Sequence, residues 1–316
     1  MNDSYNDQQQ SFIEEEIDFG ELFQALKDGR WIIISSTSFF ILIGVIISLM
    51  LPNIYHSKAL LVPVNTSSGM LSSLQSYSGL ANLAGVNLPS SASGIEDNTS
   101  TGIKKLSTLS FFENNILPKI FLPDLMAVKS WDSKTNTMIY DEDIYNITNN
   151  SWVRDFSSPQ QQIPSAQESF KIFVEENLEI STDKKTGFVS IITKHQSPYI
   201  SKQWNELLIR EINTFYRQKD KEEAQNSIEY LNAQLAATSF SEVKEVMAKL
   251  LQQEIQKLTL VEASEFYVFD YIDPPAAMEE RSEPNRALIC IICVLLGGIL
   301  GVFLTLLKHY RHRARN

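Results

Sequence analysis

The chain has 316 residues, of which 43% are apolar, and it carries a formal net charge of −11 at pH 7. Apolar residues are concentrated in two uninterrupted blocks, 31–51 and 287–307, each 21 residues long and without a charged side chain. A helix of that length rises about 31 Å, which matches the hydrocarbon core of a bilayer. The sequence therefore predicts two transmembrane helices and excludes a purely soluble enzyme. The acidic balance also argues against a nucleic-acid-binding protein, which needs a basic surface.

The residues that flank the two blocks predict the topology. The first 30 residues are acidic, unlike the short basic start of a secretory signal peptide, so the first block is expected to stay in the chain. The last nine residues contain four basic side chains and no acidic one, namely Lys308, Arg311, Arg313 and Arg315. Under the positive-inside rule such a tail is cytoplasmic. We therefore expect cytoplasmic segments at 1–30 and 308–316 and one extracytoplasmic domain at 52–286.

The extracytoplasmic domain starts with a mixture of strands, loops and short helices. In chain order the patterns predict a strand at 54–64, a Ser- and Gly-rich loop at 65–102, a helix at 103–117, an irregular aromatic-rich segment at 130–160, a helix at 166–177 and a hairpin at 178–193. Ser165 and Glu168 have the spacing of a capping box that opens the 166–177 helix. Because the first strand directly follows a transmembrane helix, the strands are expected to form a mixed α/β base near the membrane.

Residues 199–273 contain neither Gly nor Pro, and they predict a long helical arm at about 198–263. Apolar residues recur at helical spacing in two stretches, separated by a charged collar at 217–223. The residues expected to define the apolar face of the arm are Trp204, Leu208, Ile228, Leu231 and Leu235. A capping box at Ser239 and Glu242 predicts the start of a second helix. The alternative is an ordinary pair of core helices, which the length and the polar collar disfavour.

A strand at 266–273 and a linker complete the domain. The strand is expected to share a sheet with the first strand and the 178–193 hairpin. The linker that leads to the second apolar block contains Pro274, Pro275, Pro284 and Arg286. In the second block, Gly297, Gly298 and Gly301 give a G-x-x-x-G spacing, which lets helix backbones approach closely. We expect these glycines to serve in transmembrane packing, with a small-residue patch that has no partner as the alternative.

Residue patterns for catalysis are absent from the sequence. There is no phosphate-binding G-x-x-x-x-G-K-[ST] loop and no G-x-S-x-G nucleophile motif. His56 and His195 are the only histidines in the 52–286 domain, and they form no metal-ligand cluster in sequence. Cys290 and Cys293 lie inside an apolar block, where a thiolate is disfavoured. The sequence predicts a protein that is not an enzyme, with no catalytic residue, cofactor or metal, although a glycosidase-like carboxylate pair stays open.

Several short segments, in their order and spacing, resemble one known family. They are 17–23, 55–60, 79–85, Thr186-Gly187, 195–198, Trp204, 230–253, 271–275 and 284–286. Together they resemble the Wzz-type bacterial chain-length determinants, also called polysaccharide co-polymerases, of the class without a cytoplasmic kinase domain. One departure is the linker, where 279–283 is charged and the family often has further prolines.

The resemblance implies an α+β protein of the bacterial inner membrane. Two transmembrane helices would flank a periplasmic domain that has a mixed α/β base and a helical arm. The implied function is non-enzymatic control of the modal chain length of O-antigen or a related glycan in lipopolysaccharide biosynthesis. The implied partners are further copies in a homo-oligomeric ring, a membrane polysaccharide polymerase and its lipid-linked glycan, and no nucleic acid.

Two other functions compete with this interpretation. A two-crossing periplasmic sensor or scaffold protein would share the topology, but a sensor needs a cytoplasmic output domain, which the nine residues after Leu307 cannot form. A periplasmic glycan-cleaving enzyme would need two carboxylates in a cleft.

Overall fold

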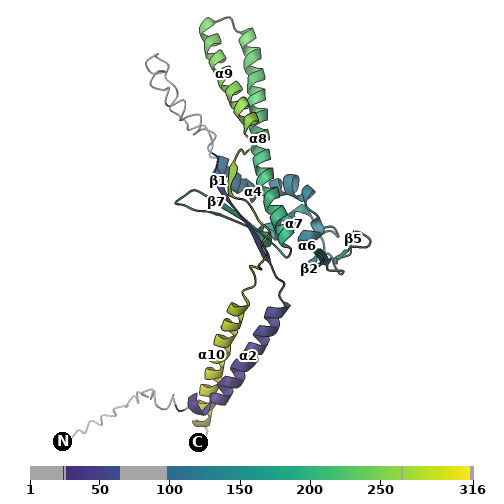
Figure 1. Ribbon diagram of the computed structural model, residues 1–316, viewed down its shortest axis with the longest axis vertical. Helices are drawn as coiled ribbons and strands as arrows, with labels where there is room; N and C mark the ends of the chain where they lie inside the picture. The colour runs from purple at the N-terminus through teal and green to yellow at the C-terminus, as the bar shows by residue number, and fades with distance from the viewer. Residues whose placement is uncertain (1–23, 25, 65–97, 265, 314–316) are drawn as a thin grey trace, which may run out of the picture. The chain divides into compact units, whose positions relative to one another are not determined.

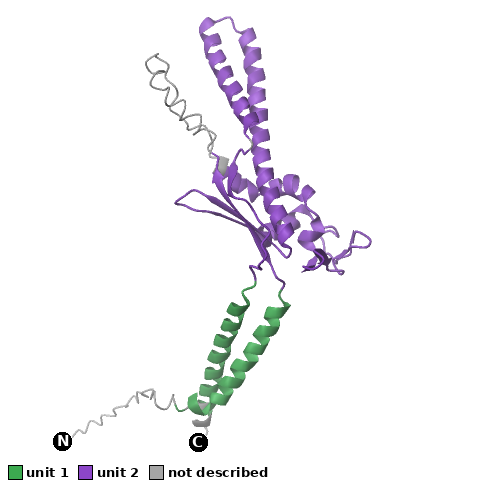
Figure 2. Cartoon of the chain, in the orientation of Figure 1, with its two compact units in different colours: residues 1–51, 284–316 green, residues 52–283 purple. Residues whose placement is uncertain are grey.

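The computed structural model describes residues 24, 26–64, 98–264 and 266–313, and these divide into two compact units (Figure 2). Unit 1 comprises Met1–Leu51 and Pro284–Asn316, and unit 2 comprises Pro52–Glu283. Residues 65–97 of the loop expected at 65–102 lie outside the described residues.

Unit 1 is a pair of long apolar helices, α2 (Arg30–Met50) and α10 (Arg286–Arg313), which lie side by side (Figure 2). Both are long and apolar enough to cross a membrane. The blocks 31–51 and 287–307 fall within these helices to within one residue. The two apolar helices and the mixed helix-and-sheet composition confirm the coarse fold class that the sequence predicts.

Unit 2 is built on a four-stranded sheet in which every neighbouring pair is antiparallel. The strands are β1 (Tyr55–Pro63), β6 (Leu178–Thr182), β7 (Val189–His195) and β8 (Phe269–Asp273), in the order β6-β7-β1-β8. Tyr55 pairs with His195 in the register of β1 and β7. The structure thus confirms that the first strand, the hairpin and the last strand share one sheet. Alternate residues of β1 and β7 are buried, so one face of the sheet packs on the core.

Short helical segments cover the sheet and carry much of the aromatic core (Figure 1). They are α4 (Asn98–Leu106), α5 (Leu109–Phe111), the π-helix η2 (Phe112–Ile116), the 3-10 helix η3 (Leu117–Lys119), α6 (Leu122–Met126), α7 (Ala166–Ile172) and the π-helix η4 (Phe173–Asn177). The single helix expected at 103–117 is therefore wrong. Thr108 has an extended backbone, and its side chain caps a new helix by accepting from the Phe111 N–H.

The segment at 130–160 is more regular than the sequence suggests. It forms two small hairpins, β2 (Val128–Asp132) with β3 (Thr137–Tyr140) and β4 (Tyr145–Asn146) with β5 (Ser151–Trp152). Asn136 and Asn150 provide the left-handed backbone in these turns, with φ of 52° and 49°. Asparagine tolerates this conformation, but it is a weaker turn signal than glycine. The two hairpins were therefore not predicted from the sequence.

Two long helices form the arm, α8 (Pro198–Ala237) and α9 (Ser241–Ala263), and they pack against each other (Figure 1). The 40 residues of α8 extend about 60 Å, which confirms the long helix expected from the Gly- and Pro-free run. Neither helix of the arm begins with a side-chain capping bond. Ser197 occupies the N-cap of α8 without a side-chain capping bond, and α9 begins after Phe240 rather than at a Ser239 capping box.

The predicted capping box of Ser165 and Glu168 opens α7. Ser165 Oγ accepts from the Glu168 N–H at 3.2 Å, as the pattern predicts. A backbone hydrogen bond from Ser165 also reaches the Glu168 carboxylate, which in addition forms an ion pair with Arg154. This pair holds the pKa of Glu168 below its ordinary value, since the Arg154 hydrogen bond outweighs the effect of burial.

Candidate functional site

The arm residues predicted from the sequence fall into two groups along α8. Trp204 and Leu208 are buried in the core of unit 2, against the covering segments of the sheet. Ile228, Leu231 and Leu235 lie farther along the helix and are only half buried. The first part of α8 is therefore a core helix, and the part beyond the charged collar is the arm proper.

Polar side chains fix the first part of α8 onto the sheet. Ser201 Oγ donates to the Thr193 carbonyl at 2.7 Å and accepts from the Ser57 N–H at 3.0 Å. Asn205 Nδ2 donates to the carbonyls of Ser57 and Ile191, at 2.8 and 2.9 Å. All five residues are buried, so each bond satisfies a backbone group that water cannot reach. The helix is thereby fixed in position on β1 and β7 by direction-specific contacts as well as by apolar packing.

Asn213 makes a second anchor, between α8 and the chain that returns from the arm. Its Oδ1 accepts from three consecutive backbone N–H groups, those of Tyr267, Val268 and Phe269, at 3.1, 2.7 and 3.0 Å. Its Nδ2 donates to the Phe269 carbonyl at 3.0 Å. A single buried amide thus sets where the arm ends and β8 begins. No local pattern marks Asn213 in the sequence, because a lone Asn in a helix is typical of a surface residue.

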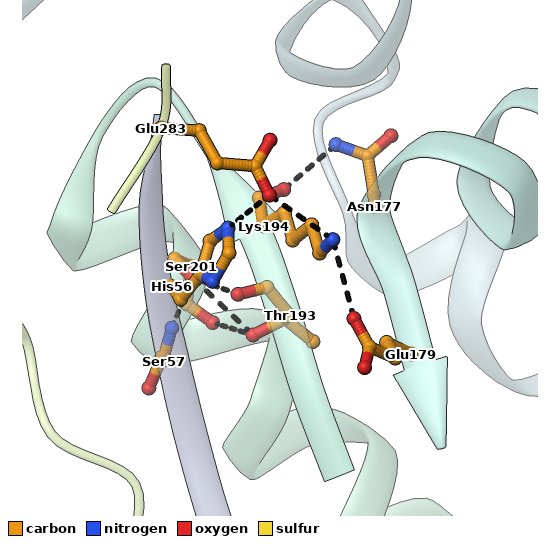
Figure 3. A network of polar contacts seen from close by, with 8 residues as sticks. All are labelled: His56, Ser57, Asn177, Glu179, Thr193, Lys194, Ser201 and Glu283. Carbon is orange, nitrogen blue, oxygen red and sulfur yellow. Dashed lines mark hydrogen bonds and ion pairs between the residues drawn. The ribbon is translucent and has the colours of Figure 1, made fainter. Parts of the chain in front are cut away.

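A charged network ties the linker to the sheet (Figure 3). Lys194 Nζ lies 3.2 Å from Glu179 Oε2 and 3.3 Å from Glu283 Oε1. His56 Nε2 lies 3.0 Å from the same Glu283 oxygen. Burial lowers the pKa of Lys194, but the hydrogen bond to Glu179 and the charge of Glu283 outweigh it and raise the pKa.

The backbone supports the same connection. Ile54 N–H donates to the Glu283 carbonyl at 2.9 Å, and Ser282 N–H donates to the Ile54 carbonyl at 2.9 Å. The residues just before β1 and the end of the linker are therefore paired. Of the predicted linker residues, Pro275 is buried and Pro274 is exposed, both in unit 2. Pro284 and Arg286 belong to unit 1, where Arg286 begins α10.

His195 is a buried structural residue. Its Nδ1 accepts from the Ser197 N–H at 2.9 Å, so its Nε2 carries the proton and donates to the Asp124 carbonyl at 2.9 Å. Burial lowers the pKa of His195 to about 4, against which the two backbone hydrogen bonds act only weakly. A neutral imidazole fixed at both nitrogens positions the α6 segment and the start of α8. In the described part of the chain, no group of three His, Cys, Asp or Glu side chains is arranged to hold a metal.

The glycines of the second apolar block separate into two kinds. A Cβ added at Gly297 would lie 2.9 Å from Thr37 Cα, and one added at Gly301 would lie 2.8 Å from Ile33 Cα. Gly298 has nothing within 4 Å, so it takes no part in this contact. Gly297 and Gly301 therefore lie against the backbone of α2 in the same chain.

The contact between α2 and α10 extends beyond the predicted glycines. Cys293 lies against Gly44, and Thr305 lies against Gly29. Small residues thus recur every four positions on α10, at 293, 297, 301 and 305. Ser36 Oγ also donates to the Gly297 carbonyl at 3.0 Å. The α2 side of this contact could not be predicted from the sequence, because small residues there are spaced irregularly.

Comparison with known proteins agrees with the resemblance seen in the sequence. Residues 15–101 match the family model described as Wzz, chain length determinant protein. The resemblance to Wzz chain-length determinants is confirmed. The match takes in α2 and β1, that is, the first apolar helix and the first strand of the sheet. No sequence among curated proteins matches the chain.

Two solved structures are similar to the chain at low sequence identity. One is a full-length bacterial polysaccharide co-polymerase, 14% identical, with a TM-score of 0.41, covering 94% of this chain and 99% of that one. The other is a fragment of WzzB, a polysaccharide co-polymerase from Salmonella Typhimurium. It is 14% identical, with a TM-score of 0.31, and covers 73% of this chain and 100% of that one.

Proposed function

We propose that the protein is a non-enzymatic regulator of the modal chain length of O-antigen or a related surface polysaccharide. The observation that carries the proposal is the Wzz match over residues 15–101. The protein would act in the bacterial inner membrane as a homo-oligomeric ring, beside a membrane polymerase that extends a lipid-linked glycan. Residues 52–286 would lie in the periplasm, and 1–30 and 308–316 in the cytoplasm.

The surface of unit 1 supports anchoring in a membrane. Large apolar side chains are exposed along both helices, among them Trp31, Phe39, Met50, Ile299 and Phe303. The faces that do not contact the other helix are thus as apolar as the face that does, a distribution typical of membrane spans and unfavourable in water. The basic residues after the second span favour a cytoplasmic C-terminus.

The arm supports association between copies. Beyond the core, α8 and α9 contact each other along one face and expose apolar residues elsewhere. Tyr230 is 64% exposed and Phe240 72%, and Val246 and Leu250 of α9 are exposed as well. An exposed apolar surface of this extent is typical of protein–protein contact. In a ring of side-by-side copies, we propose that these residues are covered by a neighbouring arm.

The function is tested by deleting the gene and separating the surface polysaccharide on a ladder gel. We expect the deletion to replace a modal cluster of lengths by a continuous distribution, and the wild-type gene to restore the cluster. A deletion strain that lacks polymer altogether would indicate a synthetic enzyme instead. Unchanged chain lengths would contradict the proposal outright.

Reporter fusions test the topology separately. A periplasm-specific reporter inserted at residue 150 should be active, and a cytoplasm-specific reporter fused after Arg315 should be active. A periplasmic signal from the C-terminal fusion would overturn the two-crossing arrangement.

A further inference from the structure

Three aromatic rings gather at the end of the sheet where the chain enters unit 2. Tyr55 is the first residue of β1, Trp131 lies in β2, and Tyr199 lies in the first turn of α8. The ring centroids of Tyr55 and Trp131 are 5.5 Å apart, and those of Trp131 and Tyr199 are 6.3 Å apart. Tyr199 is 56% exposed, and the other two are half buried. Three segments distant in sequence therefore build one aromatic surface.

The connection to the apolar helices limits how far this surface can lie from a membrane. Tyr55 follows the last residue of α2, Met50, by five positions, and a fully extended chain of that length spans at most about 18 Å. On the other side, Glu283 precedes the start of α10 at Arg286 by three positions and is hydrogen-bonded to Ile54. Two short tethers thus enter unit 2 at the same corner, beside the aromatic cluster.

The chemistry of the cluster fits the interfacial layer of a bilayer. Trp and Tyr are enriched there because they combine an apolar ring with a polar N–H or O–H group. Trp131 Nε1 donates to Asn136 Oδ1 at 3.0 Å, so its polar edge is already satisfied while its ring packs beside the exposed Tyr199. None of the three side chains is basic, so the contact does not depend on anionic lipid.

We propose that Tyr55, Trp131 and Tyr199 form an aromatic platform that rests in the phospholipid headgroup layer and fixes the base of unit 2 on the membrane. The inference depends on the membrane anchoring in the proposed function. It goes further because it gives unit 2 a lipid contact of its own. Such a contact would hold α8 at a defined angle to the bilayer, which short tethers alone do not do.

Helix α8 provides two exposed positions at a known separation for the test. Tyr199 and Tyr230 lie on this one helix, 31 residues or about 47 Å apart, and both are exposed. In the full-length chain with Cys290→Ser and Cys293→Ser, a single cysteine replaces Tyr199, Tyr230 or Ile41 of α2 and carries a fluorescent label. The protein is reconstituted in phosphatidylcholine nanodiscs that contain either headgroup- or acyl-chain-quencher lipids.

We expect the headgroup quencher to reduce emission from position 199 several-fold more than from position 230. Label at position 41 should respond to the acyl-chain quencher, which establishes insertion independently. If position 41 is quenched and position 199 behaves as position 230 does, the aromatic platform is wrong while the membrane anchoring stands. If position 199 is protected from the lipid probe and from aqueous iodide alike, protein covers it, which would overturn the lipid assignment in favour of another copy of the chain.

Intrinsic fluorescence provides a check without a label at the platform. The headgroup-quenched part of the tryptophan emission should fall in Trp131→Phe and stay unchanged in Trp152→Phe, a matched change in β5. An equal response of both variants would contradict the proposal. The full chain is used in each case, and circular dichroism confirms that each variant folds.

Discussion

The two ends of α8 are held by different kinds of contact. At the base, buried polar groups such as Asn205 and Asn213 bond to specific backbone atoms of the sheet and the returning chain. In the arm, α8 meets α9 through half-buried apolar side chains and exposed ion pairs, such as Lys221 with Glu262 at 3.0 Å. The base is therefore specified within one chain, whereas the arm leaves apolar surface for something else to cover.

Asn213→Ala should break the base and gives the largest expected loss of stability. It leaves three buried N–H groups and one carbonyl without their side-chain partner. We expect the free energy of unfolding to fall by about 4 kcal/mol, since each orphaned buried group costs about 1–3 kcal/mol before local rearrangement. Urea denaturation of unit 2 in the full-length protein measures the loss.

The matched control for this change is Asn226→Ala. Asn226 is exposed on the same helix, within the arm. Its substitution should change the free energy of unfolding by less than about 0.5 kcal/mol. Equal effects of the two substitutions would mean that the Asn213 contacts do not anchor the arm.

Ile228→Pro should break the arm and leave the base folded. Proline in a helix interior costs about 3 kcal/mol or more, and it redirects the chain beyond it. Because Ile228 lies past the charged collar, the core around Trp204 should keep its structure. We expect a ladder without a modal cluster, like that of the deletion strain, at unchanged protein level. A retained mode would show that an intact arm is not needed for length control.

The base and the arm differ in how far their features can be predicted from the sequence. The long helix, the shared sheet and the apolar helices follow from periodicity and composition, which act over many residues. The anchors at Ser201, Asn205 and Asn213 depend on single polar residues that meet backbone groups about 50–150 positions away. No local pattern encodes such a meeting. The broken 103–117 helix has a different cause, because Thr108 ends it through a local side-chain bond in a sequence of helical spacing.

The stability of the base should depend on pH through His195. Its pKa of about 4 lies below the ordinary 6.5, so the folded protein binds fewer protons than the unfolded chain between these values. Neutral His195 therefore makes its full contribution to the free energy of unfolding above about pH 6.5. This contribution is lost as the pH falls toward 4, and the free energy of unfolding falls by up to about 3 kcal/mol. His195→Gln should flatten the curve of unfolding free energy against pH in this window, whatever the overall stability of the variant. An unchanged slope in His195→Gln would contradict the assignment.

The packing of α2 on α10 gives a smaller effect, confined to unit 1. Gly297→Leu and Gly301→Leu place side chains against the α2 backbone, which overpacking measurements suggest costs about 1–3 kcal/mol each. Gly298→Leu, one position from Gly297, meets open space and should cost less than about 0.5 kcal/mol. Unfolding in mixed detergent micelles compares the three variants. Equal stabilities would show that close approach at Gly297 and Gly301 does not stabilise the pair.

Single exposed carboxylates on the arm should matter least. Glu222 is exposed and accepts one hydrogen bond, from Gln218 Nε2 at 2.8 Å, so Glu222→Ala removes about 0.5 kcal/mol or less. If length control depends on the assembled arm surface, this change should move the modal length slightly and keep the modal distribution. A catalytic carboxylate would behave differently, because its removal abolishes function without affecting assembly. The decisive comparison therefore scores each carboxylate-to-Ala variant both by ladder gel and by native electrophoresis of the oligomer. A variant that loses modality while its oligomer stays intact would identify an active site and refute the non-enzymatic function.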